Sequence, residues 1–202
     1  ITFESGSAVP AYLGVPGHAH PGGLPIEEYR TRQDQFRRAE IAALLDTPYF
    51  IERAQELYGY PHFICDTGGS ICEWVDPDDP NDPLLNVLAK DCLMIWIEGS
   101  DAHTESLIAR FDKEPKPMSY QPEFLARVWS EYLSNNNAQP SEVDPDEFIR
   151  WTYAQALAHR QPRYASMARN FGVTVQASDM AAVTSEAAFV DVIADALAAR
   201  TS

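Results

Sequence analysis

The stretch CLMIWI at residues 92–97 decides the predicted fold of this chain. An uninterrupted apolar run of this length is typical of a strand that is buried on both faces, as in a parallel sheet covered by helices. Glu98-Gly99 ends the run, and Ser100 or Asp101 is then suited to cap a helix over residues 103–111. A strand followed directly by a helix is the repeating unit of parallel α/β proteins, so this segment indicates the fold class.

Two more strands are predicted, HFIC at residues 62–65 and VTVQA at residues 173–177. Apolar periodicity and helix-capping residues predict helices in much of the remaining chain, at residues 25–45, 47–59, 84–89, 121–133, 145–159, 162–171 and 184–199. Strands separated by helices require crossover connections, which join parallel strands. We therefore expect an α/β fold with three layers: a mainly parallel sheet, helices on both of its faces, and a helix-rich insertion.

Length and charge narrow the domain organisation and the partners. The 202 residues fit a single domain, residues 1–202, with 45% hydrophobic and 22% charged side chains. A formal charge of −15 argues against a broad basic face for nucleic acids and against docking on anionic lipid. We expect no nucleic-acid partner and no membrane association, whereas a nucleotide or small phosphate ligand needs only a few well-placed cations.

The cysteines indicate the cellular compartment. Cys65, Cys72 and Cys92 are odd in number and lie in or beside apolar runs, which favours reduced, buried thiols. The sequence holds no run of 18 apolar residues and no pattern of a secretory signal. These features predict a cytoplasmic protein.

The segment HFICD ends in Asp66, which is the first candidate for chemistry. Ligands of open parallel sheets bind at the carboxyl ends of the strands, and a carboxylate there can hold Mg²⁺ as a Walker B aspartate does. The residues after it have the properties of a binding loop, with two glycines that allow close approach and two hydroxyls beside them: Thr67, Gly68, Gly69 and Ser70. The alternative is that Asp66 only caps the turn that follows, and the sequence favours neither interpretation.

The second candidate begins at the central strand. The segment LMIWIEGSDAHTESLIARFDKEPKP, residues 93–117, resembles small-molecule P-loop kinases, in which a buried strand leads into a helix and a mobile lid. The resemblance implies that Arg110, Lys113 and Lys116 contact the transferred phosphate and that Arg110 is a catalytic residue. The alternative is that these basic residues complement the dipole at the C-terminus of their helix, and for any single one we weigh this more heavily.

The resemblance extends along most of the chain. Residues 172–179 and 184–198 resemble the closing strand and final helix of such a kinase domain. Three further segments resemble an uncharacterised bacterial family described only as ATPases: FESGSAVPAYLG (3–14), FICDTGGSICE (63–73) and KPMSYQPEFL (116–125). The resemblance implies a P-loop-kinase-like fold, with ATP and Mg²⁺ as cofactors.

The phosphate-binding loop of that family is not found in this sequence. No GxxxxGK(S/T) motif occurs in the 202 residues, so the lysine that would reach the β- and γ-phosphates is missing with it. The resemblance implies that the first βα unit, which carries this Walker A loop, lies before Ile1. We therefore expect an ATPase or kinase-like protein whose present chain binds ATP weakly or not at all.

Two other functions stay open. A non-catalytic interaction or regulatory domain would keep a kinase-like scaffold without its chemistry, and a homodimer would fit that role. A metal-dependent hydrolase would use Asp66, Glu73 and a carboxylate of the acidic loop at residues 76–82.

The arginines of the first predicted helix are expected to pair with carboxylates on neighbouring turns rather than to gather around a bound anion.

Overall fold

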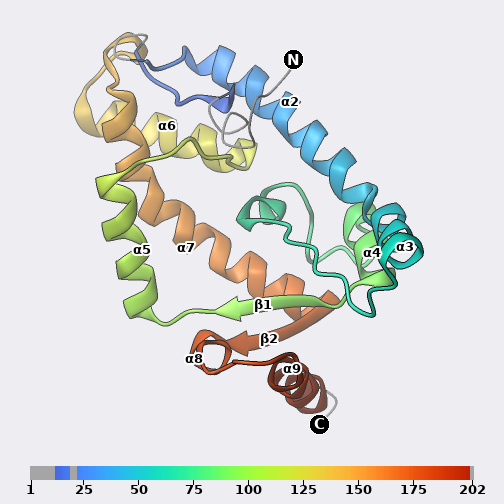
Figure 1. The fold of residues 1–202 in the computed structure, drawn as a ribbon. Helices are drawn as coiled ribbons and strands as arrows, with labels where there is room; N and C mark the ends of the chain where they lie inside the picture. Colours follow the sequence, from blue (N-terminus) through green and yellow to red (C-terminus); the bar gives the residue numbers. More distant parts are fainter. Residues whose placement is uncertain (1–11, 19–21, 201–202) are drawn as a thin grey trace. The chain divides into compact units, whose positions relative to one another are not determined.

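The computed structural model describes residues 12–18 and 22–200 of the chain (Figure 1). The chain divides into two compact units. Unit 1 comprises Ile1–Glu40 and Ser106–Ala158, and unit 2 comprises Ile41–Glu105 and His159–Ser202. Each unit has its own hydrophobic core and is treated separately below.

Helices make up most of the described chain, labelled as in Figure 1. The α-helices are α2 (Ile26–Leu45), α3 (Thr47–Tyr58), α4 (Pro83–Asp91), α5 (Asp101–Lys113), α6 (Pro122–Asn136), α7 (Pro145–Phe171), α8 (Ala177–Ala181) and α9 (Glu186–Arg200). Two 3₁₀ helices, η1 (Gly69–Glu73) and η2 (Pro140–Glu142), and two strands, β1 (Met94–Glu98) and β2 (Gly172–Gln176), complete the order. No helix among residues 12–18 and 22–200 combines the length and the apolar character needed to cross a bilayer.

The sheet belongs to unit 2 and consists, in the described residues, of β1 and β2. The strands are parallel and paired from Met94↔Gly172 to Glu98↔Gln176. A parallel pair connected through helices is compatible with the α/β class. The three-layer sheet is wrong for the described chain, because two strands do not form the central layer of such a fold.

The segment HFIC accounts for part of this difference. Residues 62–65 are irregular rather than a strand, and Ile64 is 85% exposed. A short apolar run becomes a strand only where a neighbouring strand accepts its hydrogen bonds and buries its side chains. In the described residues the sheet consists of β1 and β2, and HFIC does not join it.

Gly172 allows the two strands to meet. A Cβ atom at this position would lie 1.8 Å from the carbonyl oxygen of Met94, so only glycine fits beside that backbone. Beyond it, the alternating pattern of β2 buries Val173 and Val175 and exposes Thr174 and Gln176. Nη1 of Arg200 on α9 donates to the carbonyl of Gly172 at 2.8 Å, which ties the last helix to β2.

The N-terminus of α4 follows from the local sequence. The side chain of Asp82 accepts hydrogen bonds from the backbone N–H groups of Leu84 at 3.0 Å and Leu85 at 2.9 Å. Pro83 occupies the first turn, where its missing N–H costs nothing. The three leucines of α4 are buried in the core of unit 2, so this capped helix anchors the segment that leads into β1.

Unit 1 has a core rich in aromatic rings. Trp129 lies edge-on to Phe148 with ring centroids 5.1 Å apart, and Tyr132 does the same at 5.3 Å. The carbonyl oxygen of the Gln33 side chain accepts the backbone N–H of Tyr120 at 2.8 Å, inside this core. The rings of α6 and α7 therefore lie in the core of unit 1.

Helix α7 is continuous where two helices are predicted. Pro162 lies inside it and removes one backbone hydrogen bond, at a cost of about 3 kcal/mol in an isolated helix. Arg163 and Tyr164 follow Pro162 directly, and their side chains donate hydrogen bonds to backbone carbonyl oxygens of η1. Such tertiary contacts offset the local preference for a break, which the sequence of residues 145–171 does not reveal in isolation.

Candidate functional site

The candidate site is the loop from Asp66 to Ser70 in unit 2, together with the network that holds it. Oδ1 of Asp66 accepts the backbone N–H of Gly68 at 2.9 Å, so the aspartate closes a tight turn on itself. Gly68 has φ 64° and ψ 168°, a conformation that residues with a Cβ rarely adopt. Asp66 therefore does cap this turn, and the residue is exposed to solvent.

Gly69 lies in close contact with α7. A Cβ atom there would lie 2.8 Å from the hydroxyl oxygen of Tyr164. That hydroxyl donates to the carbonyl oxygen of Gly69 at 2.7 Å, and the thiol of Cys72 donates to the same oxygen at 3.2 Å. The second glycine of the loop thus lets a helix approach the backbone, which is a structural use of close approach.

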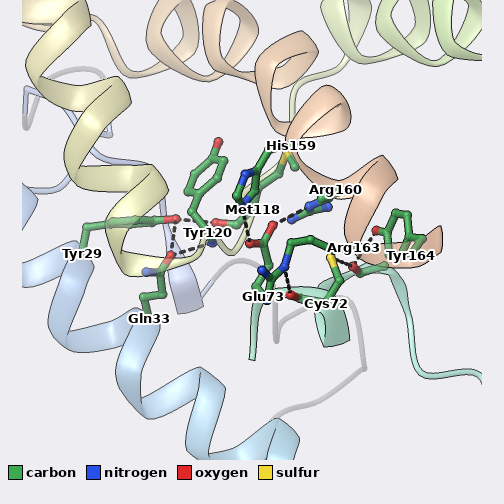
Figure 2. A network of polar contacts seen from close by, with 11 residues as sticks. Tyr29, Gln33, Cys72, Glu73, Met118, Tyr120, His159, Arg160, Arg163 and Tyr164 are labelled. Atoms are coloured by element: carbon green, nitrogen blue, oxygen red, sulfur yellow. Dashed lines mark hydrogen bonds and ion pairs between the residues drawn. The ribbon is translucent and has the colours of Figure 1, made fainter. Parts of the chain in front are cut away.

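A buried ion pair lies at the end of η1 (Figure 2). The side chain of Glu73 is 0% exposed, and its Oε1 accepts Nε–H of Arg160 at 2.6 Å. Nε2 of His159 lies 3.9 Å from the other carboxylate oxygen, which is beyond hydrogen-bond distance. A charge this deeply buried requires a paired countercharge, and Arg160 supplies it from α7.

Arg163, one turn after Arg160 on α7, also holds η1 and the residues after it. Its Nε donates to the carbonyl of Cys72 at 2.7 Å, and its Nη2 donates to the carbonyl of Val75 at 2.6 Å. Arg160, Arg163 and Tyr164 are three and four residues apart, so they project from one face of α7. We call these three residues with Gly69, Cys72 and Glu73 the η1–α7 network; it fixes η1, and with it the loop Asp66–Ser70, to the helix (Figure 2).

The network changes the acidity of its members. Burial, and then the charge of Glu73, raise the pKa of the Cys72 thiol to about 11. Burial, and then the neighbouring Cys72, raise the pKa of the Tyr164 hydroxyl well above its usual value. Burial opposes the charge of Arg160, but Glu73 raises the pKa of its guanidinium overall. The thiol and the phenol therefore stay protonated and are not nucleophiles at neutral pH.

We expect the free energy of unfolding to fall as pH rises from 9 to 11. Both folded-state pKa values are raised, so the unfolded chain loses these protons first and the stabilising effect is complete only below about pH 9. Two pKa units at Cys72 correspond to about 2–3 kcal/mol. Urea unfolding at four pH values measures this.

The variants Cys72→Ala and Tyr164→Phe are the controls for this pH dependence. Each is expected to flatten the decline relative to the native chain, because one group no longer titrates. Parallel curves for the native chain and Cys72→Ala would contradict the assignment of the decline to this thiol.

The other predicted residues lie in unit 1. Arg110 and Lys113 occupy the last turn of α5, and Lys116 follows the helix; all three are exposed. Nζ of Lys116 lies 3.9 Å from a carboxylate oxygen of Glu114. The loop Asp66–Ser70 belongs to unit 2, so the predicted site residues fall into two groups in different units. The positions of Arg110 and Lys113 in the last turn of α5 also fit the interpretation that these basic side chains complement the helix dipole.

The metal-hydrolase hypothesis finds no ligand cluster in the described residues. Within them, no group of three or more His, Cys, Asp or Glu side chains is arranged to hold a metal ion. Glu73 is engaged with Arg160. In the acidic loop, Asp76 accepts the N–H of Asp78 at 3.1 Å and Asp79 accepts that of Asn81 at 2.8 Å, so these carboxylates shape turns.

Sequence reasoning missed the pairing of Glu73 with Arg160. The two residues are 87 positions apart, and no local spacing connects them. A signal does exist, because Glu73 lies inside the apolar segment ICEWV, where a charge indicates a buried partner.

The local pairing expected for the first helix is confirmed on α2 by the ion pairs Arg30–Glu27, Arg32–Glu28, Arg37–Asp34 and Arg38–Asp34.

Comparison of the chain with protein-family models, with curated proteins and with solved structures found no match. The function is therefore inferred from the geometry of unit 2 and from the sequence.

Proposed function

We propose that the chain is a nucleotide-handling protein of the ATPase or kinase-like type, with Asp66 as the carboxylate beside a nucleotide-bound Mg²⁺. The observation that carries the proposal is the exposed Asp66 on a turn that Gly68 and the η1–α7 network hold in one geometry. A fixed carboxylate binds a hydrated cation without first losing conformational freedom.

The donor chemistry fits the ion. Mg²⁺ prefers oxygen ligands, keeps several of its waters and is commonly held by one or two carboxylates together with substrate phosphates. One oxygen of Asp66 is used in the turn, and the exposed side chain leaves the other for a magnesium-bound water. ATP with Mg²⁺ supplies the phosphoryl group, and catalysis in this class is chiefly positioning and stabilisation of charge.

The two parallel strands of unit 2 are compatible with an α/β nucleotide-binding protein but do not form the three-layer sheet of the P-loop kinases. The carboxyl ends of β1 and β2 meet at the pair Glu98↔Gln176, and Gln176 Nε2 donates to Glu98 Oε2 at 2.8 Å. Ligands of parallel sheets bind at this edge, where Gly99 and the first turn of α5 follow β1. The expectation that Arg110, Lys113 and Lys116 contact the transferred phosphate rests on the resemblance to P-loop kinases alone, and the proposal for Asp66 does not depend on it.

Isothermal titration with Mg·ATP tests the proposal. The expected dissociation constant is about 1 mM or weaker, because no GxxxxGK(S/T) loop is present to hold the phosphates. Asp66→Asn should weaken binding roughly threefold or more, since asparagine keeps the turn but removes the charge.

The matched control is Asp79→Asn. Like Asp66, Asp79 accepts the backbone N–H of the residue two positions later, here Asn81 in the acidic loop. This variant should bind Mg·ATP as the native chain does. Micromolar affinity would contradict the expectation of weak binding, and equal affinity for the native chain and Asp66→Asn would contradict the role of Asp66.

The alternative is a non-catalytic interaction or regulatory domain, favoured by the lack of a phosphate-binding motif in the sequence. It predicts a stable complex or homodimer in solution and no change of melting temperature with nucleotide, whereas the nucleotide proposal predicts an increase.

A further inference from the structure

Helix α3 and the turn after it present large apolar side chains to solvent. Among the residues of α3, the structure buries Thr47. Four others on α3, and Tyr60 in the turn after it, are between 52% and 66% exposed, and we call these five residues the α3 aromatic surface: Tyr49, Phe50, Leu57, Tyr58 and Tyr60. Single exposed apolar residues are ordinary, but several on one short element indicate a binding surface.

The rings of this surface are arranged before any partner binds. Tyr49 and Phe50 meet edge-on with centroids 5.7 Å apart, and Leu57 follows Phe50 by seven residues, on the same side of the helix. Tyr58 and Tyr60 stack with centroids 5.3 Å apart, because Gly59 turns the chain with φ 64°. Rings that already contact one another lose little conformational entropy on binding.

Unpaired carboxylates border these rings. Asp46 and Glu52 are exposed, and within the described part of the chain their side chains make no hydrogen bond or ion pair. Glu56, four residues after Glu52, pairs with Arg53. Unit 2 holds 17 acidic and 6 basic side chains, so it carries −11 of the formal charge of −15. Aromatic faces beside carboxylates attract cations by two effects, the ring quadrupole and the negative charge.

We propose that the α3 aromatic surface docks a basic amphipathic helix of a partner protein. Its apolar side chains would cover Phe50 and Leu57, and its Lys or Arg side chains would meet Asp46 and Glu52. Charge decides against a second copy of this chain, because a symmetric contact would bring the same carboxylates together. This role is independent of the nucleotide proposal, since none of its residues belongs to the loop Asp66–Ser70.

Fluorescence anisotropy with synthetic peptides tests the proposal. The probe is a labelled helical peptide of about 18 residues with leucine on one face and lysine on the other. A Leu/Glu peptide of the same pattern and a lysine peptide without leucine serve as ligand controls. We expect micromolar binding of the Leu/Lys peptide to the native chain and much weaker binding of both others.

Two variants separate this surface from general attraction to an acidic protein. Phe50→Ser with Leu57→Ser should weaken binding by about tenfold or more, and Glu52→Lys by roughly threefold or more. The matched controls on α9 are Val190→Ser, 48% exposed, and Asp191→Lys, also exposed, and both should bind as the native chain does. Circular dichroism confirms that each variant is folded.

Three outcomes would overturn the proposal. Equal losses in the α3 and α9 variants would show non-specific charge attraction. Equal binding of the lysine peptide without leucine would remove the apolar contact. A native dimer in sedimentation equilibrium that Phe50→Ser with Leu57→Ser converts to monomer would make a second copy the occupant.

Discussion

Replacing Glu73 by methionine is expected to lower the free energy of unfolding by about 3–5 kcal/mol. The substitution leaves Arg160, itself buried, without its countercharge and without the 2.6 Å hydrogen bond to Oε1. A loss of this size is a large share of the roughly 5–15 kcal/mol that stabilises an ordinary domain. Chemical unfolding at neutral pH, followed by circular dichroism, measures it.

A double-mutant cycle identifies the cause. Glu73→Met combined with Arg160→Met should lose less stability than either single variant, because an apolar pair replaces the two charges together. The control is Glu131→Met on α6, which removes an exposed ion pair with Arg127 and should cost less than about 1 kcal/mol. A loss below about 1 kcal/mol for Glu73→Met would contradict the importance of the buried pair.

Gly172→Ala is expected to lower the free energy of unfolding by about 3 kcal/mol. The added methyl group would lie 1.8 Å from the carbonyl oxygen of Met94, and the obstructing atom is backbone, which cannot rotate away. The first pair of the β1–β2 ladder must then separate. Because Trp96 lies on β1 beside Tyr164, its fluorescence should change together with the loss of stability.

Gly59→Ala separates crowding from backbone conformation. Gly59 has φ 64°, and no atom lies within 4 Å of the position that a Cβ would take there, so alanine meets conformational strain alone. Its expected cost is about 1–2 kcal/mol. If Gly172→Ala were as stable as the native chain, the close approach of the two strands would be contradicted.

The sequence predicts elements that are defined by local patterns. The apolar run at residues 92–97 becomes β1 at Met94–Glu98, and the run at residues 173–177 becomes β2 at Gly172–Gln176. The helix predicted at residues 84–89 is α4 at Pro83–Asp91, and its first turn is fixed by the neighbouring cap Asp82. Features that depend on distant contacts are not evident from local sequence: HFIC does not join the sheet, and contacts at η1 stabilise α7 past Pro162.

The candidate site shows the same division. The turn at Asp66 and the use of Gly68 are encoded within three residues, and the sequence suggests both. The contact of Gly69 with Tyr164 joins residues 95 positions apart, so a pattern of two glycines cannot distinguish it from a ligand-binding loop. The exposed apolar side chains of α3 follow the expected helical period, and only their exposure in the folded chain shows that they are not core.

Backbone amide NMR of the chain titrated with Mg·ATP shows whether Asp66 and its loop bind a nucleotide-bound Mg²⁺. We expect saturable shifts at the amides of Asp66–Ser70, strongly reduced in Asp66→Asn and retained in Asp79→Asn. Shifts that leave Asp66–Ser70 unaffected, or that persist unchanged in Asp66→Asn, would contradict it.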